Sequence, residues 1–242
     1  MFARAATSGF AALVFALGVV SSARSGAFPA QHTWSAVASA PTTDMTKSPP
    51  PVEDQHSSES EPFGLATTIV PAGPFVTMWE IMENRISADR EALTRCREAA
   101  ERCSAAAQSF LAIVAEGREH TDRARIGVIN RAINLTIHPA NLNYWTAPLE
   151  TFAIGRGNCK QYAIAKYLAL IEAGISENDV KLVIVADLAT AENHALLAVR
   201  LNSDWIMLDN RWLSMVRDTE MRGVIPLFVL DHDGVKQFLP LS

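Results

Sequence analysis

The sequence predicts an α+β fold in which several helices are followed by a mainly antiparallel sheet. Between residues 77 and 137, apolar side chains recur at spacings of three and four, which is the period of amphipathic helices. After residue 180, short runs rich in leucine, valine and isoleucine are separated by turn sequences, which is typical of strands. Because strands and helices do not alternate along the chain, the pattern does not favour a parallel, doubly wound sheet.

The composition indicates a globular protein with a large hydrophobic core. The chain has 242 residues, of which 49% are hydrophobic, and a formal net charge of −5. We do not expect such an acidic chain to bind nucleic acid, because nucleic-acid-binding proteins neutralise phosphates with an excess of lysine and arginine. Three cysteines are too few for a disulfide-dense scaffold.

Residues 1–27 have the organisation of a secretory signal peptide. Arg4 supplies a positive charge, residues 9–20 form a short apolar run, and small residues that suit a cleavage site follow. An uncleaved membrane anchor is the alternative, but a spanning helix needs about 20 apolar residues. We therefore expect export, cleavage, and a periplasmic or secreted mature protein without an integral membrane segment.

The rest of the sequence divides at residue 62. Residues 28–62 contain six of the 12 prolines, together with serine, threonine and acidic residues. This composition buries too little apolar surface to fold alone, so it predicts a disordered spacer. A docking segment for a partner is the alternative interpretation. Residues 63–242 have the length of one domain.

Four helices are predicted in this domain. Ser104 is a cap for the second helix, and Thr121 or Asp122 is a cap for the third. Pro139 ends the third helix, and a glycine closes the fourth. The predicted ranges are 77–102, 105–117, 122–138 and 160–173.

Five strands follow. The turns at residues 202–204 and 231–234 are short and polar, so each of them predicts an antiparallel hairpin. The predicted strands are 181–186, 194–201, 205–209, 224–230 and 235–239.

Cys159 is the first candidate for chemistry, because it directly precedes the fourth helix. Backbone N–H groups and the positive end of the helix dipole favour the thiolate, which is the nucleophilic form. Arg156 and Lys160 add positive charge, while Gly155 and Gly157 allow the backbone to turn and a substrate to approach. A small, buried, unreactive cysteine is the alternative.

A nucleophilic cysteine needs a histidine base, and the base needs an acceptor that orients its ring. His194 opens one predicted strand and Asp209 ends the next, so an antiparallel hairpin brings both to the same end of the sheet. Taken singly, His194 could be an ordinary surface or core residue and Asp209 a turn residue. Metal binding by these residues and Cys159 would lack a fourth ligand of suitable spacing. Together the three predict a Cys-His-Asp triad.

Three segments resemble the bacterial transglutaminase-like cysteine peptidase family, which includes periplasmic proteases that release biofilm adhesins. The segments are WTAPLE at residues 145–150, GNCKQYAIAKY at residues 157–167 and LDN at residues 208–210. The resemblance extends from about residue 75 to residue 212. It implies a papain-like/transglutaminase-like core, in which the nucleophile helix packs on an antiparallel sheet.

The resemblance also implies a role for each residue of the predicted triad. Cys159 would be the nucleophile, His194 the general base and acid, and Asp209 the residue that orients the imidazole. The backbone N–H of Cys159 would donate to the oxyanion, an interaction worth a factor of ~10²–10³ in rate. Trp145 is a candidate for the cleft, with a core aromatic residue as the alternative.

The sequence departs from the adhesin-releasing proteases beside the nucleophile. Those relatives typically read Gly-Asp-Cys-Glu-Asp-Tyr, and their acidic residues help to bind calcium. Here Asn158, Lys160 and Gln161 replace the three acids. Calcium prefers several carboxylate oxygens, so we expect no calcium at this position and no other cofactor.

Cys96 and Cys103 are the remaining cysteines. In an unbroken helix, residues seven apart are separated by about 10 Å, so a disulfide would require a break between Glu98 and Arg102. Free buried thiols are the alternative. The resembled family tends to carry a cysteine pair in this region, and an exported protein favours oxidation. We therefore expect a bridge that leaves Cys159 free.

The leading expectation is an extracytoplasmic cysteine peptidase that hydrolyses a protein or peptide through a thioester intermediate. A transglutaminase-type acyltransferase is one alternative, because an amine can resolve the same thioester. A catalytically silent peptide-binding module of the same fold is the other.

Overall fold

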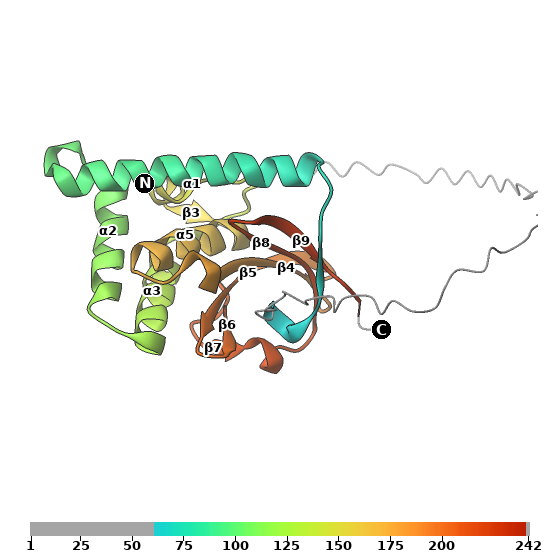
Figure 1. Cartoon of the computed structure of the whole chain (residues 1–242). Helices are drawn as coiled ribbons and strands as arrows, with labels where there is room; N and C mark the ends of the chain where they lie inside the picture. The colour runs from blue at the N-terminus through green and yellow to red at the C-terminus, as the bar shows by residue number, and fades with distance from the viewer. Residues whose placement is uncertain (1–60, 241–242) are drawn as a thin grey trace, which may run out of the picture. The chain divides into compact units, whose positions relative to one another are not determined.

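The computed structural model of the chain describes residues 61–240 (Figure 1). The predicted signal peptide, and the predicted spacer up to residue 60, lie outside the described residues. The last two residues assigned to the spacer, Glu61 and Pro62, belong to the folded unit. Pro62 is buried, and the Glu61 carboxylate lies 2.9 Å from Lys181 Nζ and 3.4 Å from Lys236 Nζ.

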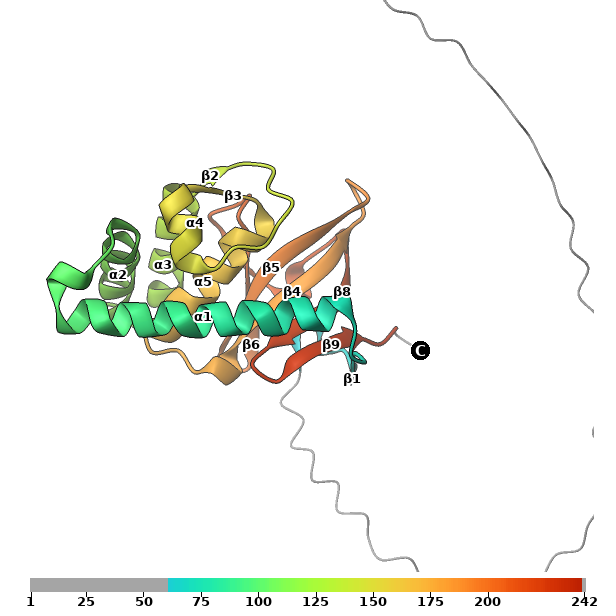
Figure 2. The ribbon, with the colours of Figure 1, turned by 90° about the horizontal axis from the view of Figure 1, so that it is seen from above.

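Helices α2, α3, α4 and α5 gather on one side of the folded unit and the large sheet lies on the other, while α1 runs alongside both (Figure 2). Ser104 caps α2 as predicted, since its side chain accepts a hydrogen bond from the backbone N–H of Ala107. Gly174 follows α5 with a φ of +95°, a conformation that favours glycine. The α-helices of the described chain are α1 (Pro74–Glu98), α2 (Ala105–Arg118), α3 (Asp122–Thr136), α4 (Pro148–Ile154) and α5 (Cys159–Glu172). Within residues 61–240, none of the helices is long and apolar enough to cross a bilayer.

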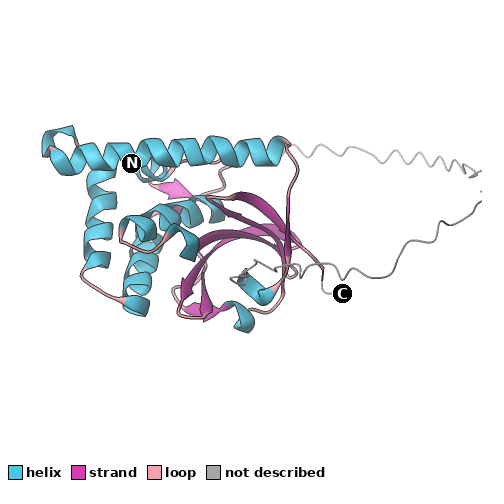
Figure 3. Ribbon diagram, viewed as in Figure 1, coloured by secondary structure: helices cyan, strands magenta, loops and turns pink. Residues whose placement is uncertain are grey.

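A curled sheet, entirely antiparallel, forms the other side (Figure 3). Its strand order is β1-β9-β8-β4-β5-β6-β7, so the predicted hairpins β5–β6 and β8–β9 are both present. A separate parallel pair, β2–β3, lies next to the start of α5. The strands are β1 (Thr67–Ile69), β2 (His138–Pro139), β3 (Arg156–Gly157), β4 (Val180–Asp187), β5 (Glu192–Leu201), β6 (Asp204–Leu208), β7 (Met215–Arg217), β8 (Val224–Asp231) and β9 (Gly234–Phe238).

Both faces of the sheet are covered. In β5, Leu197 and Val199 pack with the helices in the main core, whereas Leu196 and Ala198 belong to a second core on the opposite face. Burial on both faces explains why the sequence of β5 is a nearly continuous apolar run instead of a strict alternation. Helix α5, which begins with Cys159, packs on β5 and β4, and most of its side chains are buried.

The structure breaks the first predicted helix at the two cysteines. α1 ends at Glu98, and a 3₁₀ turn (Ala100–Arg102) reverses the chain before α2. This break brings the Cα atoms of Cys96 and Cys103 to 4.6 Å, and the two residues form a disulfide. Cys159 is a free thiol.

Candidate active site

Cys159 is held at the first position of α5 by a capping box. The side chain of Asn158 accepts from the backbone N–H of Lys160 at 3.3 Å, and the Gln161 side chain accepts from the backbone N–H of Asn158 at 3.0 Å. A Cβ at Gly157 would lie 2.6 Å from the Cβ of Gln161. Gly157 thus makes room for the cap inside the protein, and it also lines the cleft beside Cys159.

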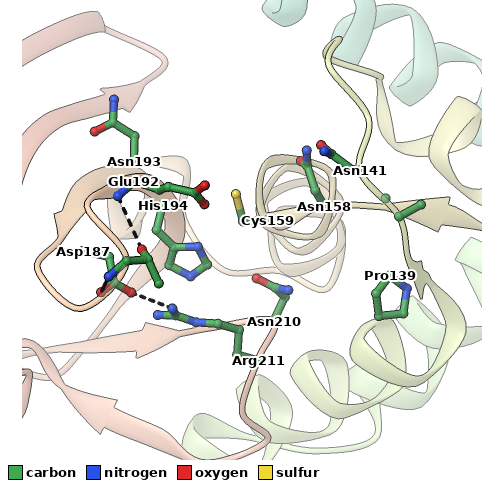
Figure 4. Close-up of a pocket in the computed structure, with 13 residues that line it drawn as sticks. Pro139, Asn141, Asn158, Cys159, Asp187, Glu192, Asn193, His194, Asn210 and Arg211 are labelled. Carbon is green, nitrogen blue, oxygen red and sulfur yellow. Dashed lines mark hydrogen bonds and ion pairs between the residues drawn. The ribbon is translucent and has the colours of Figure 1, made fainter. Parts of the chain in front are cut away.

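His194 and Asp209 meet at one end of the sheet. His194 is the third residue of β5, and Asp209 directly follows β6. The Nε2 atom of His194 lies 3.0 Å from Oδ1 of Asp209, and each side chain is only 10% exposed. This contact leaves the other ring nitrogen for Cys159, which lies across the opening from the imidazole in Figure 4.

The surroundings of Cys159 favour its thiolate. Burial by itself raises the pKa of the thiol. Hydrogen bonds from the His194 imidazole and the Ala195 backbone N–H lower it, as do the positive charges of His194 and Lys160. Together these causes outweigh burial, so the pKa of Cys159 lies below its ordinary value.

The surroundings of His194 favour the protonated form of its imidazole. Burial by itself lowers the pKa of the imidazole, but hydrogen bonds and negative charge from Asp209 and Cys159 raise that pKa to about 9. In Asp209, burial is likewise outweighed, here by hydrogen bonds from His194 and Arg211, which hold the pKa of the carboxyl well below its usual range. These directions favour a thiolate–imidazolium pair beside an ionised aspartate at neutral pH.

Arg211 is a site residue that the sequence analysis did not single out. Its guanidinium donates to Oδ2 of Asp209 at 3.1 Å and 3.0 Å and to Oδ2 of Asp187 at 2.6 Å. Its backbone N–H also donates to Oδ1 of Asp209 at 2.8 Å. Both oxygens of the Asp209 carboxylate are therefore held by Arg211, in addition to the contact of Oδ1 with His194. The position of Arg211, two residues after Asp209, was a visible signal, but its contact with Asp187 depends on the pairing of distant strands.

Lys166 of α5 reaches the backbone of Asp209. Its side chain is fully buried, and Nζ donates to the backbone carbonyl of Asp209 at 3.1 Å. Asn134 of α3 donates to the same carbonyl at 3.0 Å. Burial lowers the pKa of Lys166 to about 7, although the charge of Asp209 opposes this shift. These contacts fix the backbone that carries the carboxylate.

The predicted nucleophile and base line an open cleft of about 680 Å³. Segments that are far apart in the sequence form its walls, namely Pro139–Asn141 on one side and the β4–β5 turn on the other (Figure 4). Asn210 and Arg211 close its floor. Trp145, the candidate cleft residue, packs against the main core and is not among the described residues that line this cleft.

Asn158, Lys160 and Gln161 stand where the adhesin-releasing proteases typically carry acids. Their side chains connect the start of α5 to the segment before α4. Lys160 Nζ donates to the carbonyl of Leu142 at 2.6 Å and to Oδ1 of Asn158 at 3.1 Å. Asn158 Nδ2 donates to the same carbonyl at 2.7 Å, and Gln161 Nε2 donates to the carbonyl of Tyr144 at 2.6 Å.

These groups do not fit a calcium ion. Hydrogen-bond donors already satisfy the available oxygens, and an ammonium group lies among them, where a hard dication would need carboxylates. Over residues 61–240, no cluster of three histidine, cysteine or acidic side chains is arranged to hold a metal.

The fold and the candidate site place a cysteine at the start of a buried helix, a histidine on β5 and an aspartate directly after β6. The class of protein follows from the comparison with known families. Residues 87–221, more than half of the chain, match the family described as bacterial transglutaminase-like cysteine proteinase, and the chain belongs to that family. No curated protein matches the chain.

Solved structures of LapG from Legionella pneumophila have a similar fold. The calcium-bound structure has a TM-score of 0.54 and 16% identity, over 60% of this chain and 87% of LapG. The EGTA-treated structure has a TM-score of 0.52 and 15% identity, over 62% of this chain and 84% of LapG. At this identity the likeness concerns the fold.

Proposed function

We propose that this protein is an exported cysteine peptidase that hydrolyses a polypeptide with Cys159, His194 and Asp209. The single observation that carries the proposal is the chain of contacts in one open cleft. A thiol at a helix start faces a buried imidazole, and an ionised carboxylate holds that imidazole from behind. The polar, solvent-open cleft suits an extended polypeptide better than a small enclosed ligand.

In this proposal the reaction has two halves. The Cys159 thiolate attacks the carbonyl carbon of the scissile peptide, and the backbone N–H of Cys159, which has no acceptor within its helix, donates to the oxyanion. The C–N bond breaks as His194 gives its proton to the leaving amine, which leaves a thioester. Water then attacks the thioester, His194 takes a proton from that water, and the carboxylate product leaves Cys159 as thiolate.

We propose that this chemistry occurs outside the cytoplasm and without calcium. The apolar run at residues 9–20 supports export, and the Lys160 contacts support independence from calcium. Mass spectrometry of the mature protein tests export. An N-terminus near Arg24 or Phe28 is expected, whereas a full-length chain beginning at Met1 in the cytosol would contradict it.

A peptide-cleavage assay with product identification tests the activity. A mixture of random peptides is incubated with the wild type, Cys159→Ala and His194→Ala, and the products are identified by mass spectrometry. We expect shorter peptides, with new carboxyl and amino termini at the cut sites, from the wild type only. Products in which an added amine is joined to a peptide carbonyl would identify an acyltransferase. Absence of any covalent product would identify a peptide-binding module.

A further inference from the structure

The charges that line the cleft are unevenly matched. The charge of Asp187 is compensated by Arg211, which also pairs with Asp209. His194, the other basic residue of the lining, pairs with Asp209. Lys160, next to Cys159 in the chain, is held by the carbonyl of Leu142. Glu192 also lines the cleft. Among residues 61–240, none of the ion pairs involves its carboxylate. It is thus an acidic side chain of the cleft that is free to pair with a ligand.

The position of Glu192 in its strand points this charge at the reaction site. Side chains alternate along a strand, so residues 192 and 194 share one side of β5, about 6.5 Å apart along the chain. Asn193 projects the other way, and the carboxylate of Glu192 extends from beside His194 toward the sulfur of Cys159 (Figure 4). Pairing of Glu192 with Asp187 at the end of β4 fixes this register.

We propose that Glu192 forms a subsite for a basic side chain, so that the protein prefers polypeptides with lysine or arginine next to the scissile bond. The inference rests on the proposed peptidase function and adds the substrate class. A carboxylate open to solvent gains little from an ion pair, so we expect a preference of roughly two- to fivefold rather than an absolute requirement.

The charge can be measured without any peptidase activity. The Cys159 thiolate attacks a methanethiosulfonate reagent, which forms a mixed disulfide and releases methanesulfinate. The probes are a cationic reagent with an aminoethyl group, an anionic reagent with a sulfonatoethyl group, and neutral methyl methanethiosulfonate. The rate constant for each charged reagent is divided by the rate constant for the neutral reagent. This ratio removes differences in the nucleophilicity of the thiolate between variants.

We expect the wild type to favour the cationic reagent over the anionic one by several-fold at low ionic strength. Glu192→Gln should reduce this ratio toward one, and Glu192→Lys should reverse it. Glu80→Lys, an equal charge change at an exposed position of α1 outside the cleft lining, is the matched control and should leave the ratio unchanged. A ratio that is the same in the wild type and Glu192→Lys would overturn the inference.

Cleavage of the random peptide mixture then tests the substrate class. We expect lysine and arginine to be enriched within two residues of the cut sites, and Glu192→Lys to enrich aspartate and glutamate instead. Cleavage without this enrichment, unchanged in Glu192→Lys, would overturn the inference and leave the peptidase proposal intact. No cleavage by the wild type would contradict the peptidase proposal, while the reagent ratios would still measure the charge of Glu192.

Discussion

Lys166 Nζ lies 3.1 Å from the backbone carbonyl of Asp209, and the lysine side chain is almost fully buried. A lysine that is fully buried is costly, because its ammonium loses hydration and here gains few partners. The lysine reaches from the same helix that begins with Cys159. It therefore couples the position of the proposed nucleophile to the position of the carboxylate that orients His194.

Replacing Lys166 should separate activity from stability. Lys166→Met keeps the length of the side chain and removes the buried charge, so we expect equal or greater thermal stability and a kcat reduced about tenfold. The folded pKa of Lys166, about 7, is below its unfolded value, so this residue makes the unfolding free energy rise with pH from about 7 to about 10. The variant should lack that rise. Lys236→Met, a change at a distant ion cluster, is the control and should leave kcat unchanged.

Arg211 should act together with Asp187. Arg211→Met removes the hydrogen bonds of the guanidinium to the Asp209 carboxylate, so we expect a loss of kcat of about tenfold. Asp187→Asn should reduce kcat less, because Arg211 keeps its contacts with Asp209. If the two residues form one unit, the double variant will be no worse than Arg211→Met alone. Fully additive losses would contradict this role, and Arg217→Met, at an exposed ion pair, is the control.

Chelation should not affect activity. Lys160 and its neighbours hold the cleft wall with hydrogen bonds, so EGTA should change neither the rate nor the melting temperature of the wild type. Lys160→Met should loosen the segment around Leu142, which we expect to lower kcat and to increase amide exchange there. Added calcium should not rescue this variant. Loss of wild-type activity in EGTA, restored by calcium, would refute the interpretation.

The disulfide should contribute to stability and not to chemistry. Closing a loop this short lowers the conformational entropy of the unfolded chain, which stabilises the folded state by about 2 kcal/mol. The double variant Cys96→Ala/Cys103→Ala should therefore melt several degrees lower and keep its kcat at temperatures where it is folded. Peptide mapping without reductant should show Cys96 joined to Cys103. A mixed disulfide that contains Cys159 would contradict the proposed nucleophile.

The sequence was sufficient where local patterns decide the structure. The isoleucine period of α3, the Ser104 cap and the β5–β6 hairpin were all predicted, and their boundaries differ by only a few residues. Strand β1 was missed because three residues are too few to show an alternation of polar and apolar side chains. It forms because β9 pairs with it. The seven-residue helix α4 is likewise too short for a pattern.

The candidate site shows the same division. The order of Cys159, His194 and Asp209 and the resemblance around them indicated a triad, because hairpin topology is a local property. The contacts of Arg211 with Asp187 and of Lys166 with Asp209 join residues that are 24 and 43 positions apart. Such contacts depend on how helices and strands pack, and a lysine inside an apolar helix sequence does not reveal its partner.

The pH dependence of Cys159 alkylation tests the central claim most directly. Iodoacetamide reacts with the thiolate, and Cys159 is the free thiol of the protein, so the rate reports the ionisation of that residue. We expect the wild type to react rapidly already near pH 6. In His194→Ala the rate should fall at that pH and rise only near the ordinary thiol pKa of about 8.5. Identical profiles for the two proteins, both rising near that value, would contradict the proposed thiolate–imidazolium pair.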